Sequence, residues 1–95
     1  MHYRITKVYH DADKREALTE VLNKKKKILQ GFEGLKSVRM VAVSDTATIA
    51  VSEYETEDQL KAVEPRFQEV MVDLMSLMTQ PPEVHNGDVF WAHEN

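Results

Sequence analysis

The sequence contains no cysteine. This excludes disulfide frameworks, thiolate nucleophiles and cysteine metal sites. The absence fits a reducing compartment, so we expect a cytoplasmic protein. Glycine is also scarce. The three glycines, at positions 31, 34 and 87, are too scattered to form a glycine-rich phosphate loop.

Long apolar runs are missing as well. The first ten residues, MHYRITKVYH, alternate polar and apolar side chains and lack the continuous apolar segment of a signal peptide. No run approaches the roughly 20 apolar residues that span a membrane. With 95 residues, 42% of them hydrophobic, the chain predicts one soluble globular domain over residues 1–95, with no membrane partner.

Positive charge is rare in the second half of the chain. Residues 1–40 carry ten Lys and Arg against five Asp and Glu, whereas residues 41–95 carry two against eleven. The net charge of −4 makes non-specific nucleic-acid binding unfavourable, and the lysine run at 24–27 has no interleaved aromatic residues. We expect no nucleic-acid partner. Halves of opposite charge favour self-association instead.

The first half of the chain predicts a strand, a helix and a hairpin. Residues 2–10 alternate with period two and are rich in β-branched and aromatic types, which indicates a strand. Apolar residues then recur with helical spacing over 13–30, with Asp13 as the expected N-cap and Gly31 as the stop. Two further strands, 35–43 and 46–54, are joined through Ser44 and Asp45.

The second half predicts a broken helix and a last strand. Thr56 and Gln59 form a capping box that starts a helix reaching about residue 79. Pro65 interrupts this helix, because proline removes a backbone donor and clashes with the preceding turn. The last strand is expected over 83–92, with a bulge at Asn86-Gly87.

The order of elements is β-α-β-β-α-β, which is typical of a ferredoxin-like α+β fold with a four-stranded antiparallel sheet. Two helices cover one face of such a sheet. Apolar residues are expected on both faces of the two middle strands. One face is assigned Val38, Met40, Ala42, Ile49 and Val51, and the other Leu35, Val41, Val43 and Ala50. The uncovered face therefore needs a partner, and we predict a homodimer.

Three segments carry a resemblance to a known family: GFEGLKSVRMV, VSEYETEDQLKAVEPRF and PPEVHNGDVFW. With the order of elements, they make nearly the whole chain resemble the antibiotic biosynthesis monooxygenase-like proteins of the dimeric α+β barrel superfamily. The resemblance implies two sheets joined face to face, with helices outside and a pocket between sheet and helices. It also implies oxidation of aromatic substrates by O₂ without a bound cofactor.

The chain departs from related proteins at two points. Many of them carry SPHF or a similar motif in the kinked helix, whereas this chain has EPRF, with Arg66 where histidine is common. Haem-degrading members use an Asn, Trp and His set with a histidine near the second helix. No histidine occurs here between His10 and His85, and Trp91 is on the last strand. Haem degradation is therefore disfavoured.

Met71, Met75 and Met78 lie along one flank of the second helix, where they continue its apolar face. No cysteine or histidine lies nearby to complete a soft-metal site, so we expect no metal there. Two interpretations stay open, because flexible thioethers can fill a core or line a pocket. For an aromatic ligand, the residues expected to contact it are Tyr9, Phe67, Met71, Met75 and Trp91.

Three residues are candidates for catalysis: His10, Lys25 and Arg66. His10 ends the first strand, where it could accept a proton in a pocket or be solvated at a loop. Lys25 falls within the apolar arc of the first helix. Its stem could cover the core while the ammonium reaches water, or the ammonium could bind a phenolate at the pocket mouth.

The sequence thus supports two hypotheses. The first is a cofactor-independent monooxygenase acting on a small aromatic or quinol-type substrate. The second is a non-catalytic homodimer that binds a hydrophobic metabolite. An apolar pocket between the helices and the sheet is expected in both.

Overall fold

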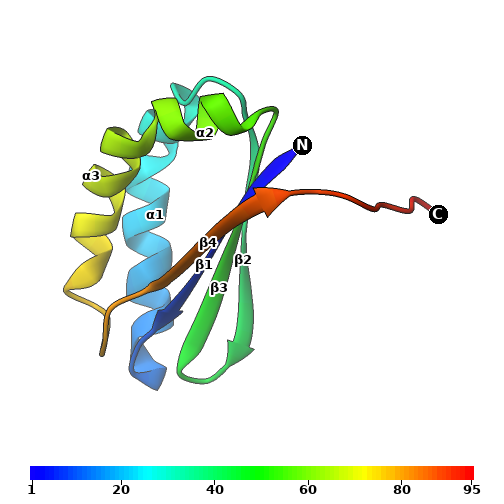
Figure 1. The fold of residues 1–95 in the computed structure, drawn as a ribbon. Coiled ribbons are helices and arrows are strands. Elements are labelled where there is room, and N and C mark those ends of the chain that lie inside the picture. Colours follow the sequence, from blue (N-terminus) through cyan, green and yellow to red (C-terminus); the bar gives the residue numbers. More distant parts are fainter.

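A computed structural model describes residues 1–95 and shows a β-α-β-β-α-β chain with its second helix in two pieces (Figure 1). The elements are β1 (His2–Tyr9), a 3₁₀ turn (Ala12–Lys14), α1 (Arg15–Gln30), β2 (Leu35–Ser44), β3 (Ala47–Tyr54), α2 (Glu57–Ala62), α3 (Glu64–Met75) and β4 (Glu83–Asp88). The predicted order of elements is confirmed.

The strands form one antiparallel sheet in the order β2-β3-β1-β4. The helices lie together on one side of this sheet, and the other side is uncovered (Figure 1). This is the ferredoxin-like α+β fold that the sequence predicted. No helix is both long and apolar enough to cross a membrane.

The second helix breaks where the proline predicted. The Thr56 side chain accepts the backbone N–H of Gln59 at 3.1 Å and caps α2. Val63 leaves the helical conformation, and α3 begins at Glu64 with Pro65 in its first turn. Proline is tolerated there because the first N–H groups of a helix have no partner within it.

Four local predictions are wrong. The second helix, expected to reach about residue 79, ends at Met75. Asp13 does not cap α1, since the chain enters that helix through the 3₁₀ turn and no side chain caps its start. The last strand ends at Asp88 rather than at residue 92. The bulge at Asn86-Gly87 is absent, because β4 pairs with β1 without any shift in register. At Asn86-Gly87, the continuous pairing of β4 with β1 outweighs the local preference for a bulge.

The register also corrects the assignment of faces. Met40 pairs with Ala50 and Val41 with Ile49, so Ile49 and Val51 lie on the face opposite to Met40. The uncovered face therefore carries an aliphatic set, which consists of Ile5, Val41, Val43, Ile49 and Val51. Ile5, Val41 and Val43 are 42–47% exposed in the single chain.

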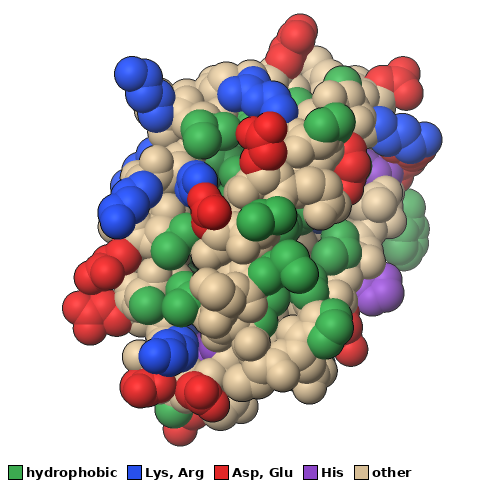
Figure 2. All heavy atoms as spheres, turned by 90° about the vertical axis from the view of Figure 1, so that its left-hand side faces the viewer, with side chains coloured by type: hydrophobic (Ala, Val, Ile, Leu, Met, Phe, Trp, Pro, Cys, Tyr) green, Lys and Arg blue, Asp and Glu red, His purple; other side chains and the backbone are tan.

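The core lies between the helices and the sheet. Its buried members come from every helix, from β1 and β3, and from the connections at Phe32 and Val63: Val8, Leu18, Phe32, Tyr54, Leu60, Val63, Val70, Met71 and Leu74. Figure 2 views the molecule from the helical side, where a band of hydrophobic side chains lies among charged ones. The helix-facing side of β1 is unusually polar, with buried His2, Arg4 and Thr6, and His10 buried just beyond the strand.

Candidate functional site

A cleft of about 500 Å³ separates α1 from the edge strand β2. Leu22 and Leu29 of α1 form one wall, and Leu35, Val38 and Met40 form the other. Polar side chains stand around these walls: Thr19, Asn23, Lys26, Gln30, Lys36 and Ser37. The cleft thus combines an apolar interior with a rim that carries two lysines, which is the usual composition of a small-molecule site.

The cleft continues inward into a smaller cavity of about 50 Å³ between the helices and the sheet. The two spaces share all five apolar wall residues of the cleft. Of the 16 residues that line the inner cavity, 14 are hydrophobic, and Phe67 and Met71 are among them. The interface between helices and sheet is therefore not fully packed at its β2 side.

A hollow of about 140 Å³ adjoins the cleft at Thr19, Leu22 and Met40 and reaches Arg15 and Thr48. Its polar groups are organised around the buried Thr48 hydroxyl. This oxygen lies 2.9 Å from Nε2 of His10 and 3.3 Å from both Nε and Nη2 of Arg15.

The partners of His10 determine its tautomer. Nδ1 lies 2.8 Å from the backbone carbonyl oxygen of Asp11, which can only accept a hydrogen bond. Nδ1 therefore carries a proton, and in the neutral ring Nε2 accepts the Thr48 hydroxyl proton. Arg15 donates to the same hydroxyl oxygen, so Thr48 connects a cation and a proton acceptor to the hollow.

A buried cation contacts two aromatic residues that line the inner cavity, Tyr54 and Phe67. Arg4 of β1 is 1% exposed, and its Nη2 lies 2.6 Å from Oε2 of Glu64. Nη1 donates to the Tyr54 hydroxyl at 3.2 Å, and the guanidinium lies 3.6 Å from the centre of the Phe67 ring. Burial raises the pKa of the Tyr54 phenol, while Arg4 acts in the opposite direction. This phenol therefore remains protonated at neutral pH.

Among the residues expected to contact an aromatic ligand, Phe67 and Met71 line the inner cavity. The other three lie elsewhere in the single chain. Met75 is half exposed beside a separate small hollow near the two adjacent prolines. Tyr9 donates to Glu83 at 2.9 Å, and Trp91 is 75% exposed in the segment that follows β4. The stripe of methionines therefore divides between the core and the surface.

The three catalytic candidates have different surroundings. His10 reaches the hollow only through Thr48. The Lys25 ammonium pairs with Asp73 of α3, which satisfies it between the two helices. Arg66 donates to the Gly31 carbonyl at 3.2 Å and lies over the Phe32 ring. None of the three side chains lines the cleft directly, and their roles stay predictions.

Sequence reasoning missed Arg4, Arg15 and Thr48. The alternation in β1 did contain a signal, because Arg4 shares the parity of His2 and Val8 and so faces the helices. For Arg15 and Thr48 no such signal existed. Their contact joins residues 33 apart in the chain and depends on how α1 docks over β3.

Comparison with solved structures gives full-length matches. A monooxygenase from the gene ActVA-Orf6 of Streptomyces coelicolor, in complex with the ligand nanaomycin D, has a TM-score of 0.85 and 20% identity, covering 99% of this chain and 91% of that one. The chain shares the fold of this monooxygenase. The Rv0793 structure from Mycobacterium tuberculosis matches with a TM-score of 0.76 and 16% identity, covering 98% of both chains.

A further solved structure, named antibiotic biosynthesis monooxygenase, matches with a TM-score of 0.72 and 9% identity over 94% of this chain and 98% of that one. No family model and no curated protein matches the chain. The resemblance noted in the sequence is thus confirmed at the level of the fold. Identities this low establish the architecture, and the chemistry has to be argued from the site.

Proposed function

We propose that this protein is a cofactor-independent monooxygenase that oxidises a small aromatic or quinol-type substrate in the cleft between α1 and β2. The observation that carries the proposal is an apolar-walled cleft of about 500 Å³ on a fold shared with a monooxygenase that was solved with the ligand nanaomycin D. Ligand sites of roughly 300–1,000 Å³ accommodate drug-sized molecules.

The reaction needs no external electron donor. In the oxidation of a phenol to a quinone, one atom of O₂ becomes the new carbonyl oxygen and the other leaves as water, so the substrate supplies all the electrons. The protein has to remove the phenolic proton, stabilise the anion and limit access of water.

In this proposal, Thr48, His10 and Arg15 perform the first two tasks. A phenol that extends from the cleft into the hollow would donate its proton to the Thr48 oxygen, while the Thr48 hydroxyl donates to Nε2 of His10. The Arg15 guanidinium, which already donates to Thr48, would stabilise the phenolate. Lys26 at the rim favours approach of an anionic substrate, whereas Lys36 is paired with Glu55 at 2.8 Å.

The experiment is O₂ uptake measured with a panel of naphthols, hydroquinones and polycyclic phenols. Thr48→Val keeps the shape of the side chain and removes the hydroxyl relay, and we expect it to lower kcat by about 100-fold, the lower range for general acid–base catalysis. Thr79→Val is the matched control, because Thr79 is exposed and its side chain has no hydrogen-bond partner. Absence of uptake across the panel would refute the proposal.

The second hypothesis, a hydrophobic-metabolite-binding homodimer without catalysis, is favoured by one observation. His10 is separated from the cavity by Thr48, and the inner walls are almost wholly apolar. It predicts that a ligand co-purifies with the protein and that O₂ is not consumed. Met40→Trp should fill the cleft and abolish binding under either hypothesis. Under the second hypothesis, which gives the Thr48 hydroxyl no role, Thr48→Val should leave binding intact.

We also propose that the aliphatic set on the uncovered sheet face pairs with the same set of a second copy. Five aliphatic side chains from three strands would otherwise remain in water. The opposite charges of the two halves of the chain support the same arrangement.

A further inference from the structure

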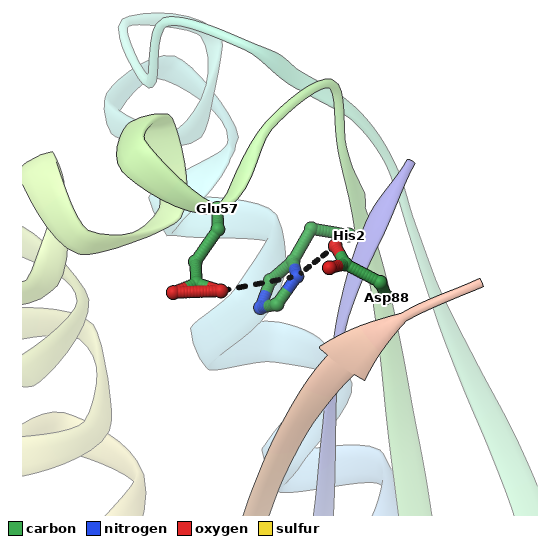
Figure 3. A group of neighbouring side chains, drawn as sticks. All are labelled: His2, Glu57 and Asp88. Carbon is green, nitrogen blue, oxygen red and sulfur yellow. Dashed lines mark hydrogen bonds and ion pairs between the residues drawn. The ribbon is translucent and has the colours of Figure 1, made fainter. Parts of the chain in front are cut away.

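Three side chains with metal-binding atoms meet at the end of the sheet that lies away from His10 (Figure 3). His2 begins β1, Glu57 begins α2 and Asp88 ends β4. The His2 Nδ1 atom lies 2.7 Å from Oδ1 of Asp88 and 4.0 Å from Oε2 of Glu57. One ligand atom from each residue lies within 4.8 Å of the other two.

The second ring nitrogen of His2 is held by a separate partner. Nε2 lies 2.8 Å from Oδ1 of Asn86, and an amide oxygen accepts, so Nε2 carries a proton. Nδ1 then faces both carboxylates and, without metal, donates its proton to Asp88; a bound cation would take the place of this proton, which is released to solvent. Metal-binding histidines almost always donate their other N–H to an oxygen, which fixes the tautomer and orients the ring. The group therefore already has the supporting hydrogen bond of a histidine ligand.

Strand pairing fixes this arrangement. His2 is paired with Asp88 and Arg4 with Asn86, so both partners of the imidazole come from the same face of β4. The imidazole is 2% exposed, whereas the Glu57 and Asp88 side chains are 44% and 72% exposed. A rigid nitrogen ligand thus faces two carboxylates that are free to adjust.

We propose that His2, Glu57 and Asp88 bind a divalent first-row cation of the zinc type, with water completing the coordination. Zinc bonds of about 2.1 Å to nitrogen and oxygen place tetrahedral ligand atoms about 3.3–3.4 Å apart. Asp88 must therefore retreat and Glu57 approach, each by roughly half an ångström or slightly more. The one close competitor is Lys61, which lies 2.8 Å from Glu57 in an exposed pair of little energetic value.

The bound cation would join the starts of β1 and α2 to the end of β4. It would stabilise the fold, because no such cluster exists in the unfolded chain. The site is independent of the proposed oxygenase chemistry. His2 begins β1 and His10 follows its end, so the two residues are roughly 26 Å apart at about 3.3 Å per residue.

The test is calorimetric titration of the chelator-treated full-length protein with ZnCl₂, together with thermal unfolding. We expect one Zn²⁺ per chain and a Tm that rises with zinc. Glu57→Gln is the decisive variant, since Glu57 forms no close hydrogen bond with His2. It should weaken zinc binding at least tenfold without lowering the metal-free Tm. Asn86→Ala should weaken binding by 10-fold or more through loss of ring orientation, at about the scale known for such partners.

His93→Gln is the matched control, because it removes a histidine from the exposed tail outside the cluster. Its zinc isotherm should equal that of the wild type. The proposal is overturned if no binding is detected at zinc concentrations up to about 100 μM. It is equally overturned if Glu57→Gln and Asp88→Asn leave the isotherm unchanged, or if His93→Gln abolishes it. Chelation should leave O₂ uptake unchanged, which separates this test from that of the proposed function.

Discussion

The pair formed by Arg4 and Glu64 gives the sharpest test of how this fold holds a buried charge. Arg4 is 1% exposed, and Glu64 is the only carboxylate that its guanidinium contacts. Glu64→Ala leaves that cation buried without a counter-charge. Loss of one partner of a buried pair costs about 3–5 kcal/mol. Because Glu64 is itself 47% exposed, water can take its place in part, and we expect a loss of about 2–3 kcal/mol.

The assay is urea unfolding followed by circular dichroism at fixed protein concentration. With a slope of about 1 kcal/mol/M, the midpoint of Glu64→Ala should fall by about 2–3 M. Glu69→Ala is the matched control, since Glu69 is an exposed residue of the same helix without an ion-pair partner. Its free energy of unfolding should change by less than about 0.5 kcal/mol.

A double-mutant cycle separates the charge from other effects of Glu64. Arg4→Met removes the cation, so in that background Glu64→Ala should cost less than about 0.5–1 kcal/mol. This remaining cost comes from the loss of a carboxylate at the N-terminus of α3. Equal costs of Glu64→Ala in both backgrounds would refute the view that an uncompensated buried guanidinium is the cause.

Three further outcomes are expected. The hydrogen bond to Asp88 chiefly raises the pKa of His2 above 6.5, so the native state holds this proton more tightly than the unfolded chain does. In the presence of chelator, protonated His2 should therefore contribute fully to the free energy of unfolding below pH 6.5, and this contribution should be lost as the pH rises through the raised pKa. A contribution to the urea midpoint that stays constant or grows with pH would contradict this. Met71→Ala should cost about 2–5 kcal/mol by thermal unfolding, whereas the half-exposed Met75→Ala should cost less than about 1 kcal/mol. Val41→Lys should shift the mass measured by light scattering from dimer to monomer, and an unshifted dimer would exclude the uncovered face as the interface.

Much of this architecture was readable from local patterns. Period-two alternation located β1, the hairpin of β2 and β3 followed from their turn, and Pro65 marked the division between α2 and α3. These features depend on residues close in sequence, and local geometry determines them. Phe67 and Met71 were also placed correctly toward the interior, because helical spacing defines a single apolar face.

Tertiary structure decided where polar side chains meet. His2 contacts Asp88 across 86 positions, Arg4 contacts Glu64 across 60, and His10 contacts Thr48 across 38. Such contacts depend on the register between distant strands and on the docking of helices, which no local spacing encodes. The cleft beside β2 has the same origin, since it depends on how α1 lies over the sheet. The sequence by itself determined the order of the elements and the apolar faces of the helices; the packing of those elements decided which strand residues share a face and which charges and hydroxyls converge.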